Sequence, residues 1–304
     1  PPYLCLMQIK PWISAFRLRT LPLALSVIAM GSFLAAAHGQ FRWSVWWLAA
    51  LTTLLLQILS NLANDYGDSI HGADKGDRKG PSRAVQSGQI TPSTMKRAMI
   101  VTALLSFVSG LALLWIALGS ELKLLLIFLA LGVLCILAAI GYTNGKRPYG
   151  YAGLGDISVL IFFGLVGVGG SYFLHTQTID WAVVLPALSV GFFSVGVLNV
   201  NNIRDIESDK AAGKYSIPVR VGRSKAVIYH WLLLTAGLFC SAMYVLQNAG
   251  GYSSWLFLVS LPLFWKVGRG VQTIEDPMQL DPFLKMMALS TMLFVITFGI
   301  GILI

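Results

Sequence analysis

Residues 43–68 read WSVWWLAALTTLLLQILSNLANDYGD, an apolar run that ends in amides and carboxylates. A helix of about 20 mostly apolar residues spans the hydrocarbon core of a bilayer, and residues 43–60 carry no charge. We therefore expect a membrane-spanning helix over residues 43–63. Ionisable groups within a span cost about 2.5–3.5 kcal/mol each, which indicates that Asp65 and Asp68 at its end have a function.

The composition extends this interpretation to the whole chain. Of the 304 residues, 56% are hydrophobic and 12% are charged, and the mean hydropathy is +0.72; soluble domains are about 25% charged. We predict an all-α integral membrane protein, with about nine transmembrane helices bundled in one domain over residues 1–304. The alternation of a membrane β-barrel is absent from the sequence. The candidate spans are residues 20–37, 43–63, 97–118, 122–143, 154–175, 181–201, 226–247, 252–268 and 286–304.

A second polar cluster ends the sixth predicted span, where residues 199–209 read NVNNIRDIESD. Asn202, Asp205 and Asp209 are spaced i, i+3 and i+7, so we expect them on one face of a helix. The first cluster has the same pattern, which hints at a repeat of helices 1–4 and 5–8, and a basic loop follows each cluster. The residues concerned are Asn61, Asn64, Asp65 and Asp68, then Arg78 and Arg83, in the first half, and Asn201, Asn202, Asp205 and Asp209, then Lys214, in the second.

The basic residues predict the orientation in the membrane. Loops rich in Lys and Arg stay on the cytoplasmic side, and a cytoplasmic N-terminus leaves only Arg42 and Lys123 of the 22 Lys and Arg residues outside. This orientation opens both polar clusters to the cytoplasmic side of the inner membrane. The formal charge of +9 then reflects topology and a polyanionic ligand, and we expect no nucleic-acid partner.

The side chains of the clusters suit one kind of ligand. Carboxylate and amide oxygens bind Mg²⁺, which keeps further positions for phosphate oxygens, and Lys and Arg neutralise the outer oxygens of a phosphate. The clusters therefore predict a site for Mg²⁺ and a diphosphate. Two alternatives remain open: the acids balance loop cations at the surface, or the chain is a secondary transporter, although transporter sites usually lie near the membrane midplane.

A third group of polar residues lies between the fourth and fifth spans, where residues 142–156 read YTNGKRPYGYAGLGD. Tyr142 and Lys146 are spaced i, i+4, so we expect them on one helical face, and Asp156 opens the next apolar run. Such residues also anchor helices at the membrane surface. The glycine-rich run over residues 164–170 lies within a span and predicts close helix packing.

At these residues the chain resembles the UbiA-type intramembrane aromatic prenyltransferases, over nearly its whole length. The first cluster ends in the family's Asn-Asp-x-x-Asp core, and the second resembles its second acidic motif, with Asn202 in the place of a first Asp. Further matches are Tyr142-x-x-x-Lys146 and Arg19-Thr20-Leu-Pro22.

Two departures indicate a branch of this family. Gly72 stands where the extended first motif has another Asp, for which Asp74 would substitute, and Ser69 stands where the 4-hydroxybenzoate branch often has Arg. The chain is most similar to the branch that prenylates 1,4-dihydroxy-2-naphthoate in menaquinone biosynthesis. Another aromatic acceptor, such as 4-hydroxybenzoate, is the alternative.

The resemblance implies a helical bundle around a central cavity that opens sideways to the lipid bilayer. It implies that a polyprenyl diphosphate binds through Mg²⁺ and basic residues and ionises, and that the allylic cation attacks the acceptor's ring, which loses CO₂ and gives demethylmenaquinone. Arg147 or Arg83 would hold the acceptor's carboxylate. The expected metal ligands are Asp65, Asp68, Asp205 and Asp209, assisted by Asn64 and Asn202; the expected diphosphate ligands are Lys146, Arg78 and Lys214; Tyr142, Asn61, Asn201 and Asp156 complete the expected site.

Overall fold

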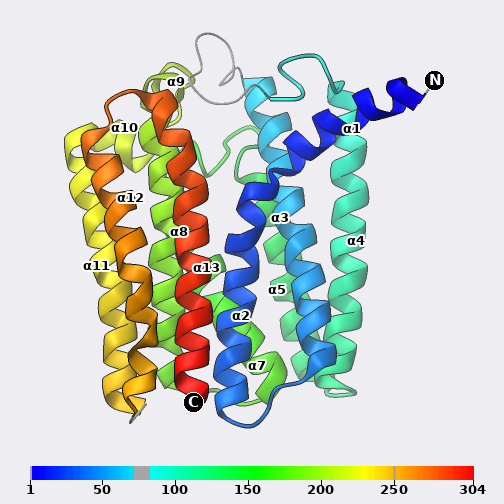
Figure 1. Ribbon diagram of the computed structural model, residues 1–304. Helices are drawn as coiled ribbons and strands as arrows, with labels where there is room; N and C mark the ends of the chain where they lie inside the picture. The colour runs from blue at the N-terminus through cyan, green and yellow to red at the C-terminus, as the bar shows by residue number, and fades with distance from the viewer. Residues whose placement is uncertain (1, 72–82, 249–250) are drawn as a thin grey trace.

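The protein is a bundle of long helices that stand side by side (Figure 1). The structure, a computed structural model, describes residues 2–71, 83–248 and 251–304, with side chains from residue 9 onward, and all regular structure in these ranges is helical. The helices in chain order are α1 (Pro2–Phe16), η1 (Leu18–Thr20), α2 (Leu21–Ala37), α3 (Trp43–His71), α4 (Pro92–Leu118), α5 (Leu122–Gly141), α6 (Gly155–Val159), the π-helix η2 (Leu160–Gly169), α7 (Gly170–Thr176), η3 (Trp181–Val183), α8 (Val184–Arg204), α9 (Ile206–Ala211), α10 (Ile217–Val221), α11 (Arg223–Asn248), η4 (Tyr252–Ser260), α12 (Leu261–Thr273), η5 (Pro277–Leu280) and α13 (Asp281–Leu303).

The helices confirm the predicted all-α membrane fold. Within the described ranges, eight helical segments are long and apolar enough to cross a membrane, and they coincide with eight of the predicted spans. The remaining prediction, residues 252–268, is divided between the 3₁₀-helix η4 and α12. Pro262 explains the division, because proline is tolerated in the first turn of an α-helix but not in its interior, so the α-helical part begins at Leu261.

Two helix ends differ from the predictions. Helix α3 continues beyond the predicted end at residue 63 to His71, so the first polar cluster lies inside the helix. Helix α5 ends at Gly141, because the side chain of Asn144 donates to the Ile140 carbonyl oxygen (3.0 Å) and Gly145 has a φ of 103°. The predicted helical face shared by Tyr142 and Lys146 is therefore wrong.

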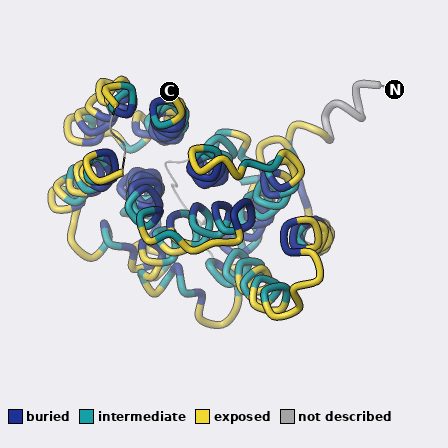
Figure 2. Tube along the Cα trace, turned by 90° about the horizontal axis from the view of Figure 1, so that it is seen from below, coloured by how far each residue is buried: buried dark blue, intermediate teal, exposed yellow. Residues whose placement is uncertain are grey.

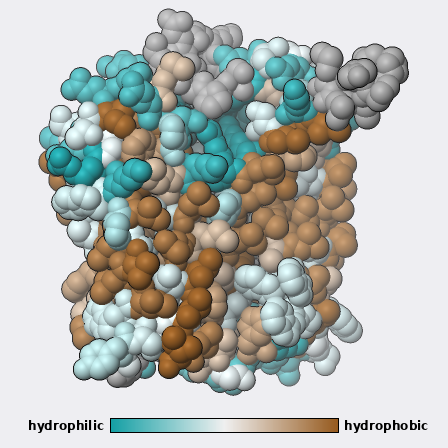
Figure 3. Space-filling model, viewed as in Figure 1, coloured by the Kyte–Doolittle hydropathy of each residue, from teal (hydrophilic) through white to brown (hydrophobic). Residues whose placement is uncertain are grey.

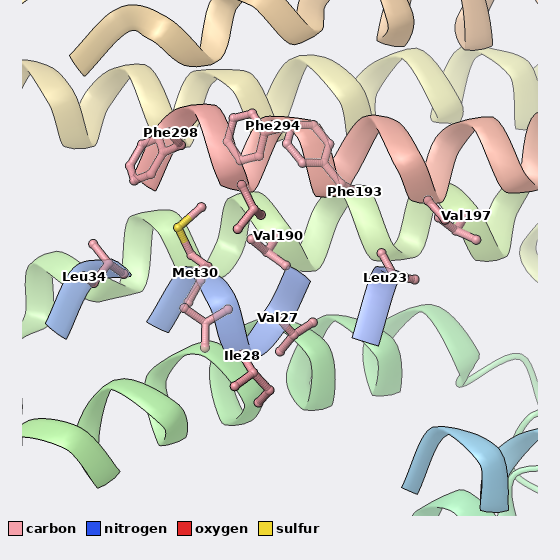
Figure 4. Packing of buried hydrophobic residues seen from close by; sticks show 14 of the residues in the cluster. Leu23, Val27, Ile28, Met30, Leu34, Val190, Phe193, Val197, Phe294 and Phe298 are labelled. Atoms are coloured by element: carbon pink, nitrogen blue, oxygen red, sulfur yellow. The ribbon is translucent and has the colours of Figure 1, made fainter. Parts of the chain in front are cut away.

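The apolar core lies where α2, α8 and α13 meet. Figure 4 shows Met30 of α2, Val190 of α8 and Phe294 of α13 packed together, and all three are fully buried. Phe193 of α8 stacks on Phe264 of α12 with ring centroids 4.4 Å apart. Because lipid tails are as apolar as these side chains, close packing rather than water exclusion holds such helices together. Figure 2 shows the buried residues on the inner sides of the helices.

Glycines let the helices approach closely, as the run over residues 164–170 predicts. A Cβ on Gly164 would lie 2.7 Å from the Ala187 carbonyl oxygen, where η2 crosses α8. A Cβ on Gly31 of α2 would lie 2.4 Å from the Val168 carbonyl oxygen of η2. Helix α5 is the opposite case, since none of its residues is buried and it packs mainly against α3 and α4.

We expect Gly31→Ala to lower the apparent melting temperature of the purified protein in detergent. The added methyl overlaps a backbone oxygen, and overpacking of this kind costs about 1–3 kcal/mol. Gly169→Ala is the matched control, because a Cβ there meets nothing within 4 Å and alanine favours the helix by up to about 1 kcal/mol. Equal melting temperatures for the two variants would contradict the close approach of α2 and η2.

Candidate active site

A cavity of about 410 Å³ lies between α2, α3, α4, α5, η2 and α8. Most of its wall is apolar, with aromatic rings such as Phe107, Phe128 and Phe162, while the charged residues Asp68, Arg83 and Lys214 come from the end of the bundle where α3 ends and α9 lies (Figure 1). That end is where hydrophilic residues collect in Figure 3, above a band of apolar surface. The polar wall contains seven of the sequence-predicted site residues, namely Asn61, Asn64, Asp68, Arg83, Tyr142, Asn201 and Lys214.

Asp68 is the acid of the first cluster that lines the cavity. It is 4% exposed, and its carboxylate is paired with the Arg83 guanidinium and accepts a hydrogen bond from the Tyr151 hydroxyl (2.8 Å). Arg83 also donates to the Asn64 carbonyl oxygen (2.5 Å). This basic residue therefore ties the end of the loop after α3 back onto the helix, beside the cavity.

Asp65 and Asn61 have structural partners in the first cluster. The carboxylate of Asp65 is buried outside the cavity wall and accepts the backbone N–H groups of Ala84 (3.1 Å) and Val85 (3.2 Å). The side chain of Asn61 donates to Phe16 O (2.9 Å) and to Thr20 Oγ1 (3.0 Å), so it holds the turn between α1 and α2. Of the side chains predicted to share one helical face, Asp68 thus lines the cavity, whereas Asp65 and Asn61 form hydrogen bonds with the backbone of neighbouring segments.

The second cluster lies at a break in its helix. Helix α8 ends at Arg204, Asp205 forms the junction, and α9 begins at Ile206. Asp205 is 3% exposed, and both of its oxygens accept hydrogen bonds from Arg204, at 2.8 Å and 2.7 Å. Asp209 Oδ2 lies 2.9 Å from the ammonium nitrogen of Lys214, and both residues are buried.

Acids from both clusters interact electrostatically with Lys214. Burial alone would lower the pKa of Lys214, but the charges of Asp209 and Asp68 raise it above its usual value. Lys214 therefore remains a cation, paired with Asp209 and stabilised by the charge of Asp68. Burial also raises the pKa of Tyr142 to about 12, so its hydroxyl remains a hydrogen-bond donor at the same end of the cavity.

The third polar group contributes less to the cavity than the sequence suggests. Lys146 and Arg147 are exposed in the loop after α5 and do not line the cavity wall. Asp156 is buried at the start of α6, but its hydrogen-bond partner is Tyr229 of α11 rather than a cavity residue. The predicted ligand Arg78 lies outside the described residues.

The donor set fits Mg²⁺ in kind. In the described part of the chain, no group of three His, Cys, Asp or Glu residues is close enough to hold a metal ion by itself. The buried amide oxygen Oδ1 of Asn202, however, has no hydrogen-bond partner among the residues described. Carboxylate and amide oxygens are the ligands that Mg²⁺ prefers, and Mg²⁺ usually takes one or two carboxylates with the substrate's phosphates completing its shell.

Several side chains at the site were missed by the sequence analysis. Tyr151, Arg204 and Asp281 all bond to residues of the two clusters or to their partners. Tyr151 and Arg204 lie within the quoted motifs, so their positions in the sequence could have indicated that they belong to the site. Asp281 had none, because it is 77 positions away from Arg204 in the chain.

Comparison with known proteins identifies the family. Residues 24–302 match the model of the UbiA prenyltransferase family. The chain belongs to that family. It is therefore a membrane-embedded prenyltransferase, as its sequence motifs predict, and the transporter alternative is set aside.

Relatives of this family member match it along nearly its whole length. A protein of Haemophilus influenzae named 1,4-dihydroxy-2-naphthoate octaprenyltransferase is 44% identical over 98% of this chain and 97% of its own. A protein of Escherichia coli with the same name is 46% identical over 96% of this chain and 95% of its own.

Solved structures support the fold at lower identity. The apo structure of a UbiA homologue from Aeropyrum pernix has a TM-score of 0.70 with this prenyltransferase, at 16% identity over 92% of this chain and 97% of that one. A UbiA homologue from Archaeoglobus fulgidus bound to GPP and Mg²⁺ has a TM-score of 0.59, at 15% identity over 95% and 99%.

We expect Tyr151→Phe to slow prenyl transfer about tenfold or more. The variant removes the hydroxyl that orients Asp68; a hydrogen bond to a charged group contributes about 1.5–3 kcal/mol, and 1.4 kcal/mol is a factor of about ten. Tyr244→Phe, in the apolar core away from the cavity, is the control. Initial rates of the purified variants check this, and an unchanged rate for Tyr151→Phe would show that the hydroxyl is not needed.

Proposed function

We propose that this protein transfers a polyprenyl group from an allylic diphosphate to 1,4-dihydroxy-2-naphthoate, with decarboxylation, in menaquinone biosynthesis. The single observation behind the acceptor is the high identity to full-length relatives named for this reaction. The cavity suits such a reaction, because most of its wall is apolar and Asp68, Arg83 and Lys214 line it at the polar end, whereas Asn202, Asp205 and Asp209 do not line the wall itself.

The polar end of the cavity is the proposed diphosphate site. Asp209 is paired with Lys214 (2.9 Å), and Asp68 and Lys214 line the same cavity; in our proposal the two carboxylates share a cation bound to diphosphate oxygens. Asp65 accepts hydrogen bonds from two backbone N–H groups, and Asp205 accepts them from the Arg204 guanidinium. A carboxylate has about four lone-pair sites, and in our proposal both also contact the metal. Asn64 and Asn202 would add amide oxygens.

Positive charge at this end favours departure of the diphosphate. Mg²⁺, when bound, would neutralise the charge that develops on the leaving oxygens. Lys214 and Arg83 line the cavity together with Asp68, and in our proposal they donate hydrogen bonds to those oxygens as the allylic C–O bond breaks. The electron pair of that bond leaves with the diphosphate.

The apolar wall protects the cation that remains. Water would quench an allylic cation, and a dry wall excludes it, while the faces of aromatic rings attract positive charge. Phe162 and Phe163 of η2 and Tyr149 line the cavity. We infer that the isoprenoid tail lies along these rings and α5.

The acceptor supplies the electrons for the new bond. Its ring carbon that bears the carboxylate attacks the cation, and the electron pair of the broken bond to CO₂ restores the ring, giving the quinol form of demethylmenaquinone. Arg83 lines the cavity whereas Arg147 is exposed outside it, so Arg83 is the better of the two to hold the carboxylate. The site would open to the cytoplasmic side of the inner membrane.

The reaction itself is the first test. We expect the purified protein, given Mg²⁺, a long-chain prenyl diphosphate and 1,4-dihydroxy-2-naphthoate, to form prenylated naphthoquinol and CO₂, and we expect EDTA to stop it, because the leaving diphosphate would lose its counter-charge. Mass spectrometry of the products checks this. Product from 4-hydroxybenzoate alone, assayed in parallel, would keep the reaction and overturn the acceptor.

The acids have a matched test. We expect Asp68→Asn and Asp209→Asn each to reduce turnover at least about a hundredfold, because loss of one buried charge at such a site costs several kcal/mol. Glu207→Gln is the control, since Glu207 lies on α9 two residues from Asp209 but is exposed. Turnover is measured on variants with wild-type melting profiles; near-normal rates for both aspartate variants would exclude the proposed diphosphate site.

A further inference from the structure

A chain of four charged side chains joins three helices next to the second acidic cluster. Arg204 is 3% exposed at the end of α8, and its Nη1 lies 2.5 Å from Oδ1 of Asp281, the first residue of α13. Oδ2 of Asp281 lies 2.5 Å from Nη1 of Arg19, in η1 before α2. The order Arg19, Asp281, Arg204, Asp205 therefore links η1, α13 and α8 through alternating charges.

Arg204 is fixed at every nitrogen of its guanidinium. Its Nε and Nη2 donate to the two oxygens of Asp205, its Nη2 also donates to Asn201 Oδ1 (2.8 Å), and its Nη1 donates to Asp281. A planar guanidinium that binds both oxygens of a carboxylate sets the plane of that carboxylate. Such a fork uses two of about four lone-pair sites, so a carboxylate can accept it and still contact a cation.

We propose that Arg204 and Asp281 are positioning residues for prenyl transfer: Asp281 orients the Arg204 guanidinium, which in turn orients the Asp205 carboxylate toward the diphosphate site. This inference rests on the proposed function. It assigns a role to the start of the last helix, which contributes no acid to either motif. Residues that orient the ligands of a metal in this way change its affinity by about 10–100-fold when they are mutated.

The charges give the inference a direction. Two arginines and two aspartates make the chain of charges neutral as a whole. Asp281→Asn would leave it with one net positive charge next to Asp205 and would loosen the guanidinium. Both effects weaken the binding of a divalent cation, whereas the residues that contact the diphosphate remain in place. We therefore expect a change in the Mg²⁺ requirement rather than in the maximal rate.

The experiment measures Mg²⁺ binding apart from turnover. Full-length wild type, Asp281→Asn and Arg204→Lys are titrated with Mg²⁺ at constant inorganic pyrophosphate, and the rise in melting temperature is followed. Initial rates against Mg²⁺ are measured on the same preparations. Arg204→Lys retains the charge but not the planar fork. Asp276→Asn is the matched control, because Asp276 is an acid five residues before Asp281 that caps η5 instead.

We expect Asp281→Asn and Arg204→Lys to need at least about ten times more Mg²⁺ for half of the thermal shift and of the rate, with kcat at saturating Mg²⁺ within about threefold of wild type. Asp276→Asn should match wild type. A lower melting temperature without ligand, with an unchanged Mg²⁺ midpoint, would show a merely structural role and overturn the inference, as would an equal shift in Asp276→Asn.

The outcomes separate this inference from the proposed function. If wild type itself shows neither a thermal shift with Mg²⁺ and pyrophosphate nor product, then the proposed function fails, and the inference fails with it. If wild type responds and the midpoints of Asp281→Asn and Arg204→Lys stay within about twofold of it, only the positioning role is lost.

Discussion

Buried carboxylates in a membrane protein need partners, and this need organises the polar end of the bundle. Asp68, Asp205 and Asp209 are each at most 5% exposed, and their partners Arg83, Arg204 and Lys214 follow or precede them in the chain. An uncompensated charge in such a place costs several kcal/mol. Each pairing therefore also fixes the backbone that brings the cation: Arg83 ties down the end of a loop, and Lys214 the turn after α9.

The same pairings account for the presence of acids in the proposed diphosphate site. Without a ligand, the positive side chains hold the negative ones in place, and the whole set remains ordered. A divalent cation bound to a diphosphate carries charges of both signs. On binding, each carboxylate would exchange a protein cation for the metal, and each Lys or Arg would exchange a carboxylate for a diphosphate oxygen, so the net charge around each group would change little. The proposed site would thus be ordered before its ligand binds, which lowers the cost of organising it.

The sequence predicts the helices well, because the length of an apolar run is a local property: eight spans were found by counting apolar residues. The roles of Asp68 and Asp209, which the sequence singles out by their spacing, stay a prediction. The i, i+4 spacing of Tyr142 and Lys146 predicted a shared helical face, but α5 ends at Gly141. Tyr142 therefore lines the cavity, whereas Lys146 is exposed. Asp65 lies on the predicted helix, but its carboxylate accepts hydrogen bonds from the backbone N–H groups of Ala84 and Val85, and no helical pattern in the sequence predicts these partners. The partner Asp281 depends on how α13 packs beside α8, which is a property of the whole fold.

Helix α5 gives the cavity an unusual boundary. One side of this helix borders the cavity, and none of its residues is buried, so in the proposed function a single helix would separate the isoprenoid tail from the acyl chains of the bilayer. Close packing, the main attraction between helices in lipid, is therefore incomplete on both sides of α5 until hydrocarbon fills them. A bound isoprenoid tail would then pack against the inner side of α5, as core side chains do in other helices. The acyl chains of the bilayer would pack against its outer side. Replacing that bilayer with detergent changes one face of the active-site wall.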